Sequence, residues 1–365
     1  MTRNVLITGG AGFIGVNFVR YWTAKYPSDK VVVLDSLTYA GNAKSLDGVA
    51  GAVLVKADIR EFENNQSIMQ EHGINLVVHF AAESHVDRSI HGPDAFLDTN
   101  ILGTHALLKA AKNTWLKPDG SWQTGCLFHH VSTDEVYGSL SATDPAFSET
   151  TAYAPNSPYS ASKAASDHIV RAYHHTYGMP VKTSNCSNNY GPFQFPEKLI
   201  PLFMLNILHG RALPIYGDGM NVRDWLYVQD HCYAIDLIIH TGRVGEVYNV
   251  GGGEELPNMQ VIDTLCAAFD ARFAADAALA ARFPDSPCAK GLRADSLKTY
   301  VKDRPGHDKR YAIDETKIRT ELGYKPQFTF ESAMAKTIDW YLNNEDWWRA
   351  VLDGSYRDWI AKNYS

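Results

Sequence analysis

The stretch from residue 5 to residue 15 decides the fold: Val5-Leu6-Ile7-Thr8-Gly9-Gly10-Ala11-Gly12-Phe13-Ile14-Gly15. A short apolar run leads into a glycine-rich turn, in which Gly10, Gly12 and Gly15 keep the G-x-G-x-x-G spacing. Glycines at such places permit a tight turn and let backbone N–H groups approach a pyrophosphate at the N-terminus of the next helix. The stretch predicts the first strand, turn and helix of a dinucleotide-binding sheet, although a turn without a ligand would also explain the motif alone.

An acidic residue stands where the second strand of such a sheet would end. Asp35 follows Gly15 by 20 residues, the place at which an acid binds the adenosine ribose hydroxyls. A carboxylate there repels a 2′-phosphate. The sequence therefore favours NAD over NADP as the cofactor.

Strand and helix patterns alternate through the first half of the chain. Short runs of continuous apolar character predict strands covered on both faces, at Val5–Thr8, Val31–Leu34, Val53–Lys56, Leu76–Phe80 and Cys126–Val131. Helix patterns lie at Phe13–Lys25, Glu63–His72, Thr99–Asn113 and Ser160–Tyr177. This alternation predicts an α/β fold with a doubly wound parallel Rossmann sheet and right-handed crossovers.

The sequence changes in character after residue 180. Prolines and glycines interrupt residues 188–224, an Ala-rich helical pattern covers about 260–283, and Val247–Val250 could return to the sheet. We expect an NAD-binding Rossmann domain and a smaller, discontinuous α/β C-terminal domain that closes over the carboxyl edge of the sheet. Their expected bounds are 1–187 with about 226–251, and about 188–225 with 252–365.

Composition narrows the classes of partner. The chain has 365 residues, 34 Lys and Arg against 41 Asp and Glu, and a net charge of −7 without a basic run, which argues against nucleic acid. No apolar run reaches the ~20 residues of a membrane span. A strand pattern begins at Asn4, so we expect no signal peptide. Five scattered cysteines without Cys-x-x-Cys spacing predict reduced thiols, a cytoplasmic location and no metal site.

A tyrosine and a lysine have the spacing of a proton-abstracting pair. Tyr159 and Lys163 lie four residues apart, one helical turn, after a strand that would end at residues 131–133. A phenol with a pKa of ~10 is a weak base at neutral pH, but a nearby ammonium and a positive nicotinamide ring favour tyrosinate. Such a pair can remove a hydroxyl proton while hydride leaves the same carbon. The alternative is a pair on a helix surface.

A carboxylate pair follows the same strand directly. Thr133 could hydrogen-bond the oxygen that is oxidised, and Asp134 and Glu135 come next. Two close carboxylates tend to split their pKa values, which leaves one protonated as an acid and one ionised as a base. Adjacent carboxylates in a loop are otherwise solvated or cap a helix. Beside a Tyr–Lys pair, they indicate that oxidation is a step toward the elimination of water.

Seven further motifs span nearly the whole chain. They are Thr-Tyr-Ala-Gly-Asn at 38–42, Ala-Glu-Ser-His-Val-Asp-Arg-Ser at 82–89, Ser-Thr-Asp-Glu-Val-Tyr-Gly at 132–138, Ser-Asn-Asn-Tyr-Gly-Pro at 187–192, Pro-Glu-Lys-Leu-Ile-Pro at 196–201, Asn-Val-Arg-Asp-Trp-Leu-Tyr-Val at 221–228 and Asp-Arg-Pro-Gly-His-Asp at 303–308. Together they resemble the dTDP-glucose 4,6-dehydratase family, in the nucleotide-sugar-modifying branch of the extended short-chain dehydrogenase/reductases.

The resemblance implies dehydration of dTDP-glucose to dTDP-4-keto-6-deoxyglucose. In that mechanism Tyr159 removes the C4 hydroxyl proton as hydride passes from C4 to NAD. Glu135 takes the C5 proton and Asp134 protonates the departing C6 hydroxyl. Hydride then returns to C6, so NAD is regenerated in each turnover and stays tightly bound.

Two other functions remain open at this point. A nucleotide-sugar C4 epimerase would use Tyr159, Lys163 and NAD but leave Asp134 and Glu135 idle. A catalytically inactive NAD-dependent scaffold or sensor would bind NAD but carry out neither reaction. The resemblance also implies a homodimer, in which the helices at 99–113 and 160–177 of both copies form a four-helix bundle.

The motifs and the resemblance together assign the ligand contacts. For NAD we expect Gly9, Gly12, Phe13, Ile14, Gly15, Asp35, Ser36, Thr38, Asp58, Ile59, Ala81, Ala82, Ser84, Thr99, Tyr159, Lys163 and Asn189. For the nucleotide sugar we expect Ser84, Thr133, Asn188, Glu197, Lys198, Leu199, Pro214, Tyr216, Arg223, Asn258, Arg304 and His307. Arg223 is expected at the diphosphate, because arginine suits bidentate phosphate contacts. Asp58 could instead be a helix N-cap, and residues 271–298 look like an insertion.

Overall fold

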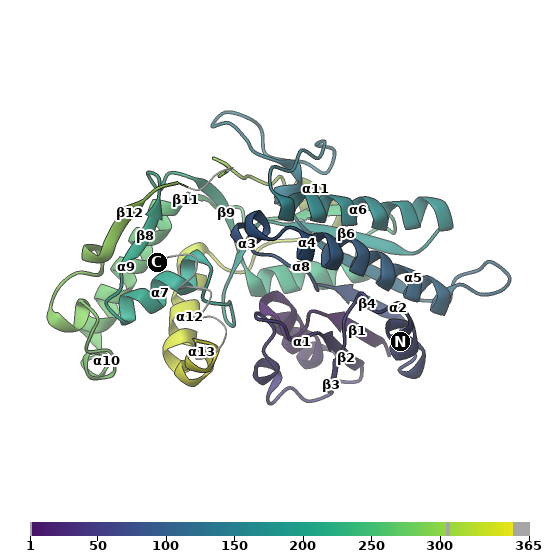
Figure 1. The fold of residues 1–365 in the computed structure, drawn as a ribbon, viewed down its shortest axis with the longest axis horizontal. Coiled ribbons are helices and arrows are strands. Elements are labelled where there is room, and N and C mark those ends of the chain that lie inside the picture. The colour runs from purple at the N-terminus through teal and green to yellow at the C-terminus, as the bar shows by residue number, and fades with distance from the viewer. Residues whose placement is uncertain (1, 304–306, 353–365) are drawn as a thin grey trace.

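The computed structural model describes residues 2–303 and 307–352, and it is built around a seven-stranded parallel sheet (Figure 1). The strands lie in the order β3-β2-β1-β4-β5-β6-β10, so chain order reverses at β1 and β4. This reversal is the mark of a doubly wound sheet and confirms the predicted α/β Rossmann-type fold. The strands are β1 (Asn4–Thr8), β2 (Lys30–Asp35), β3 (Ala52–Lys56), β4 (Leu76–His79), β5 (Leu127–Thr133), β6 (Val181–Cys186) and β10 (Val247–Val250).

Helices cover both faces of this sheet (Figure 1). On one face α1 (Phe13–Lys25) packs beside α8 (Val228–Thr241), and Trp22 shares a buried cluster with Ile7 of β1 and Ile235 of α8. The other face is covered by α2 (Phe62–Glu71), α5 (Thr104–Trp115) and α6 (Pro158–Tyr177). Shorter elements complete this part: η1 (Ala43–Leu46), α3 (Val86–His91), α4 (Asp94–Phe96), the π-helical η2 (Leu97–Gly103) and η3 (Asp134–Tyr137).

Strand β6 is buried although its sequence is polar, and neither β6 nor α8 was among the predicted elements. Several polar side chains of β6 have partners inside the protein. Lys182 Nζ donates to the Ile238 and Ile239 carbonyl oxygens at the end of α8, both at 2.9 Å. Ser184 Oγ lies 3.1 Å from His129 Nε2 on β5. Because hydrogen bonds replace water, a central strand can carry these residues without an apolar pattern.

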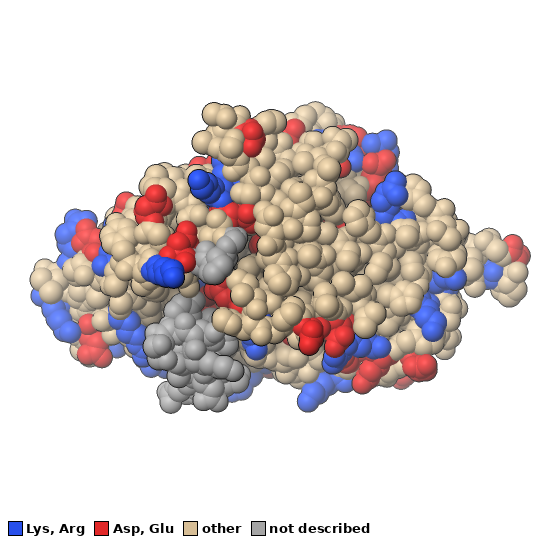
Figure 2. All heavy atoms as spheres, turned by 45° about the horizontal axis from the view of Figure 1, so that its top comes forward, with Lys and Arg blue, Asp and Glu red and all other residues tan. Residues whose placement is uncertain are grey.

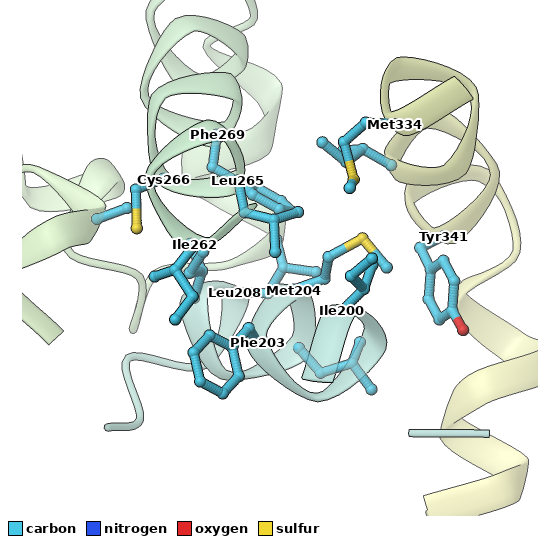
Figure 3. Packing of buried hydrophobic residues seen from close by; sticks show 14 of the residues in the cluster. Ile200, Phe203, Met204, Leu208, Ile262, Leu265, Cys266, Phe269, Met334 and Tyr341 are labelled. Carbon is cyan, nitrogen blue, oxygen red and sulfur yellow. The ribbon is translucent and has the colours of Figure 1, made fainter. Parts of the chain in front are cut away.

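The C-terminal half has a core of its own. Its helices are α7 (Leu199–Leu208), α9 (Asn258–Ala275), α10 (Ala278–Arg282), α11 (Thr316–Leu322), α12 (Phe330–Asn343) and α13 (Glu345–Leu352), with short 3₁₀ turns η4 (Cys288–Lys290) and η5 (Ala294–Leu297). A three-stranded sheet holds β7 (Asn188–Tyr190), β9 (Val222–Tyr227) and β11 (Glu255–Pro257), and β8 (Leu213–Tyr216) pairs with β12 (Lys298–Val301). Side chains of α7, α9 and α12, among them Met204, Phe269 and Met334, point toward one another in this core (Figure 3).

We propose the two-domain division that the sequence predicts, and the separate cores support it. The proposed boundaries differ from the predicted ones in one segment. Ile318 of α11 and Tyr324 are buried against Tyr248 and Val250 of the large sheet. Tyr311 and Ala312 likewise pack with the residues that follow β5. Residues 311–324 therefore belong by packing to the sheet rather than to the C-terminal core.

The segment that looked like an insertion contributes to the C-terminal core. Phe273, Leu279 and Phe283 are at most 8% exposed and belong to the cluster drawn in Figure 3. Leu292, in the same segment, is 60% exposed. Residues 271–298 thus do more than decorate the surface. In the described residues, no helix combines the length and apolar character needed to cross a bilayer.

The packing of this segment leads to a stability prediction. Phe283→Ala removes a buried ring and leaves a cavity, so we expect the free energy of unfolding to fall by about 3–5 kcal/mol. Leu292→Ala, on the exposed side of the same segment, should change it by less than about 0.5 kcal/mol. Urea unfolding followed by circular dichroism measures both. Equal effects of the two substitutions would contradict the placement of this segment in the core.

Candidate active site

A cavity of about 490 Å³ runs along the carboxyl ends of the strands of the large sheet. Its wall brings together every residue that the sequence predicts to bind NAD, and also Thr133, Asp134, Glu135, Tyr159 and Lys163. The opposite wall comes from residues 187–189, 194–195 and 197–200, between β6 and the start of α7. Segments far apart in the sequence therefore meet at one crevice, where ligands bind in sheets of this kind.

The glycine turn fits a pyrophosphate. Gly9 has a φ of +68°, and a Cβ on it would lie 2.7 Å from the backbone nitrogen of Ala81. A Cβ on Gly15 would lie 2.1 Å from the carbonyl oxygen of Gly9. Gly12 caps α1 without a side-chain hydrogen bond, and no acidic residue stands in the first turn. The N–H groups at the start of α1 thus face the cavity, where they suit an anion.

Asp35 ends β2 and anchors this turn. Its Oδ2 accepts a hydrogen bond from the Ala11 N–H at 2.9 Å, and its Oδ1 accepts one from Leu37 at 2.8 Å. Burial raises the pKa of the carboxyl, and the two backbone donors act in the opposite direction. Each oxygen keeps a lone pair that a ribose hydroxyl can use. The residues present therefore fit the adenosine half of NAD.

Asp58 does not cap a helix. The residue that caps α2 is Glu61, while Asp58 Oδ2 pairs with the guanidinium of Arg60 at 2.6 Å. Hydrogen bonds from Arg60 lower the pKa of Asp58. This ion pair lies in the cavity wall with Ile59, so the helix-cap alternative is wrong and the position beside the adenine stays a prediction.

The carboxylate pair begins where β5 ends. The Thr133 hydroxyl donates to Asp134 Oδ1 and accepts from the Glu135 N–H, both at 3.3 Å. Asp134 is 1% exposed, and its Oδ2 has no hydrogen-bond partner among the described residues. Burial first, then the charges of Glu135 and Asp224, hold the pKa of Asp134 well above its usual range. Asp134 is therefore kept protonated, which suits an acid.

Tyr159 and Lys163 lie in the first turns of α6, whose start is well defined. Ser157 forms a capping box with Ser160, and proline follows the cap at the first helical position. Both functional side chains face β5, where Lys163 Nζ donates to the Val131 carbonyl oxygen at 2.9 Å. Burial, followed by the charge of Glu135, raises the pKa of Tyr159 well above its usual range. Lys163 is not among the main influences on this pKa, so its predicted effect on Tyr159 stays a prediction.

The far end of the cavity holds predicted substrate residues. Ser84, Asn188 and Leu199 line it together with Glu197 and Lys198, and Lys198 Nζ donates to the Ser84 carbonyl oxygen at 3.3 Å. Glu197 is buried, and burial raises its pKa to about 7, opposed by the charges of Lys198 and Arg88. Its carboxyl group can thus exchange a proton near neutral pH.

Three residues around Glu197 were missed as site residues. Tyr39 donates its hydroxyl to Glu197 Oε1 at 3.3 Å, and the guanidinium of Arg88 lies 3.6 Å from the Tyr39 ring centre. His85 Nε2 is 3.8 Å from Glu197 Oε2. All three belong to the motifs at 38–42 and 82–89, so the signal was present, but only the fold brings those motifs against residue 197.

Other predicted substrate residues do not line this cavity. They are Pro214, Tyr216, Arg223, Asn258 and His307, while Arg304 lies outside the described residues. Arg223 is 5% exposed because it stacks 4.3 Å over the Tyr311 ring and donates to the Asp308 carbonyl oxygen at 2.9 Å. Across residues 2–303 and 307–352, no group of three His, Cys, Asp or Glu side chains is arranged to hold a metal ion.

Comparison with known proteins gives one consistent family. The model described as GDP-mannose 4,6 dehydratase matches residues 6–337. A dTDP-glucose 4,6-dehydratase of Xanthomonas campestris pv. campestris (strain B100) is 54% identical over 355 residues, 96% of this chain and 97% of the relative. The crystal structure of DesIV, a dTDP-glucose 4,6-dehydratase of Streptomyces venezuelae with NAD and TYD bound, is 45% identical with a TM-score of 0.83, over 95% of this chain and 99% of that one.

A second enzyme class shares the architecture at lower identity. The UDP-glucose 4-epimerase of Thermotoga maritima, solved with UDP-glucose, has a TM-score of 0.79 and 26% identity over 94% of this chain and 99% of that one. The fold alone thus does not separate the two classes, whereas identity along nearly the whole length does. The chain belongs to the GDP-mannose 4,6 dehydratase family and, within it, groups with the dTDP-glucose 4,6-dehydratases.

Proposed function

We propose that this chain dehydrates dTDP-glucose to dTDP-4-keto-6-deoxyglucose, with NAD as a tightly bound cofactor. The observation that carries the proposal is the cavity shared by the glycine turn, Tyr159 and the Asp134–Glu135 pair. An epimerase needs the turn and the tyrosine but gives the carboxylates no task. The high pKa of buried Asp134 supports an acid at this place.

The first step is oxidation at C4. NAD, which the glycine turn and Asp35 would hold, would supply the hydride acceptor for C4, the hydride donor for C6 and a positive ring charge in the site. Tyr159 removes the C4 hydroxyl proton, and the Thr133 hydroxyl beside it orients that oxygen. Burial opposes ionisation of Tyr159, so Lys163 and the added positive charge must favour the tyrosinate.

Elimination follows from the new ketone. A carbonyl at C4 acidifies the C5 hydrogen, and Glu135 takes that proton. Asp134 gives its own proton to the C6 hydroxyl, which leaves as water. As hydride is returned to C6, Glu135 gives a proton back to C5, and the proton that Tyr159 took from O4 replaces, by exchange with solvent, the one that Asp134 lost. Both carboxyl groups must therefore lie within reach of the same sugar.

Substrate contacts beyond the reacting carbons complete the proposal. Ser84, Asn188, Glu197, Lys198 and Leu199 hold the hexose, supported by their place in the cavity wall. For the nucleotide and diphosphate we retain the predicted residues of the C-terminal half, Pro214, Tyr216, Arg223, Asn258, Arg304 and His307.

One assay separates the candidate functions. The protein is incubated with dTDP-glucose in deuterated water, and the alkaline absorbance of a 4-keto sugar is followed with deuterium at C5. The proposal predicts both signals. Formation of a galactose product without deuterium would establish the epimerase instead, and the absence of either product would favour a scaffold or sensor.

Glu135→Gln tests the assignment of the C5 base. An amide cannot take the C5 proton, so we expect kcat to fall by about 10²–10⁴ fold. Absorbance of the reduced nicotinamide should still rise after mixing, because oxidation at C4 precedes elimination. Stopped-flow absorbance gives this burst, and normal turnover by the variant would remove Glu135 from its role.

Tyr159→Phe tests the earlier step. Without the phenol hydroxyl, the C4 proton has no acceptor and kcat should fall by about 10²–10⁴ fold. In contrast to Glu135→Gln, no rise in nicotinamide absorbance should appear in the stopped-flow trace. A burst of wild-type size would show that another group removes this proton.

We also propose that the protein works as a cytoplasmic homodimer, joined by α5 and α6 of both copies. The five free cysteines support a reducing compartment. An apolar surface beside α5 and α6 supports the dimer: Ile90, Leu97 and Leu102 are between 41% and 58% exposed. In Figure 2 few charged side chains occupy the middle of the face on which these helices lie.

Sedimentation velocity tests the dimer. Wild-type protein should sediment as two chains of 40.6 kDa at micromolar concentration. Leu102→Arg places a charge in the proposed interface and should weaken the dimer by at least about tenfold. Leu292→Arg is the control, because Leu292 is equally exposed on the C-terminal part. Monomers of the wild type would contradict the proposal.

A further inference from the structure

A buried carboxylate lies directly behind the Tyr159–Lys163 pair and has no part in the steps above. Asp167 is 6% exposed and sits one helical turn after Lys163 on α6. Its Oδ1 lies 3.0 Å from His130 Nε2, and its Oδ2 accepts hydrogen bonds from Ser132 at 2.8 Å and from Tyr153 at 3.0 Å. Asp167 thus ties α6 to the last residues of β5.

The ammonium of Lys163 needs a compensating charge. Lys163 is 5% exposed, and its Nζ donates to a single carbonyl oxygen, that of Val131. Burial lowers the pKa of Lys163, and the charge of Asp167 is the largest effect in the opposite direction. Without an anion nearby, a buried lysine tends to lose its proton. A neutral Lys163 could not favour tyrosinate at Tyr159.

We propose that Asp167 is a positioning residue for Lys163: although the two form no direct ion pair, the carboxylate is buried with Lys163 one helical turn away on α6, supplies the negative charge that keeps Lys163 charged, and fixes the strand end from which Thr133 projects. This inference rests on the proposed function only in the test that measures activity. Asp167 itself takes no part in bond making, since it is absent from the cavity wall.

His130, His79 and Cys186 are uncharged at neutral pH and do not substitute for Asp167, whereas the negative charge of Glu135 faces Tyr159. His130 and His79 are fully buried, and burial, with the charge of Lys163 adding to it, holds their pKa values well below the usual range. Burial raises the pKa of Cys186 to about 12, so its thiol stays protonated. The titratable groups that face the pair are His79 of β4, His130 of β5, Cys186 of β6, Asp134, Glu135 and Tyr137 of η3, Tyr153 before α6, and His168 of α6.

Ionisation of Asp167 sets the pH range of this arrangement. Burial raises the pKa of Asp167 to about 6, opposed by Lys163 and by the hydroxyls of Ser132 and Tyr153. The carboxylate is therefore charged at neutral pH and neutral well below pH 6. Loss of its charge would lower the pKa of Lys163.

A purely structural role is the competing explanation, because Asp167 holds three donors whatever its effect on Lys163. A second buried carboxylate that is paired with a more exposed lysine serves as a control to separate the two explanations. Asp236 of α8 is also buried and bonded by hydroxyls, those of Tyr21 and Tyr26, and it pairs with Lys25 at 2.5 Å. Lys25, however, is 44% exposed and loses little solvation.

The first test is a double-mutant cycle on stability, which needs no activity. Asp167→Asn leaves an uncompensated buried charge and should lower the urea midpoint of unfolding. Adding Lys163→Met removes that charge and should recover most of the lost midpoint. In the control pair, Lys25 is 44% exposed and stays solvated without its partner, so adding Lys25→Met to Asp236→Asn should recover only a small part of any lost midpoint. Additive effects at Asp167 and Lys163 would overturn the proposal.

The second test is the pH profile of kcat in the wild type, Asp167→Asn and Asp236→Asn. A lowered pKa of Lys163 should move the alkaline limb of the Asp167→Asn profile to lower pH by about one unit, with KM for dTDP-glucose unchanged. Asp236→Asn should keep the wild-type profile. An unmoved limb in a folded Asp167→Asn protein contradicts the inference, whereas a wild type without dehydratase activity would contradict the proposed function and leave the stability cycle as the test.

Discussion

Burial of ionisable side chains at and near the end of β5, away from solvent, governs the chemistry of this site. Asp134, Tyr159 and Lys163 are each at most 9% exposed, and burial is the largest influence on the pKa of all three. Burial keeps Asp134 protonated, resists ionisation of Tyr159 and tends to neutralise Lys163. The first effect provides an acid, while the other two must be offset by charges nearby.

The doubly wound sheet explains how those charges come together. Parallel strands end at one edge, so the turn after β1, Asp35 at the end of β2 and the pair after β5 share a cavity. Helix α6 then lays Tyr159, Lys163 and Asp167 against β5 at helical spacing. Oxidation and elimination can proceed on one sugar because these two sources of groups, strand ends and a helix face, meet at the same strand.

Much of this could be predicted from local sequence. The continuous apolar runs predicted five strands of the sheet, and the glycine spacing and Asp35 located the turn. Strand β6 escaped prediction because Lys182 and Ser184 are satisfied by partners distant in sequence. The contacts of Tyr39 and Arg88 with Glu197, and the burial of Arg223 under Tyr311, also depend on segments that only the fold brings together.

The central claim is that one site removes hydride from C4 of the sugar, holds it while water leaves, and delivers it to C6. Its most direct test is to supply dTDP-glucose deuterated at C4, without added NAD, and to locate the label in the product by NMR. The account predicts that the deuterium arrives at C6 of a 4-keto-6-deoxy sugar. Deuterium that remains at C4, as an epimerase would leave it, or that is lost to solvent would contradict the account.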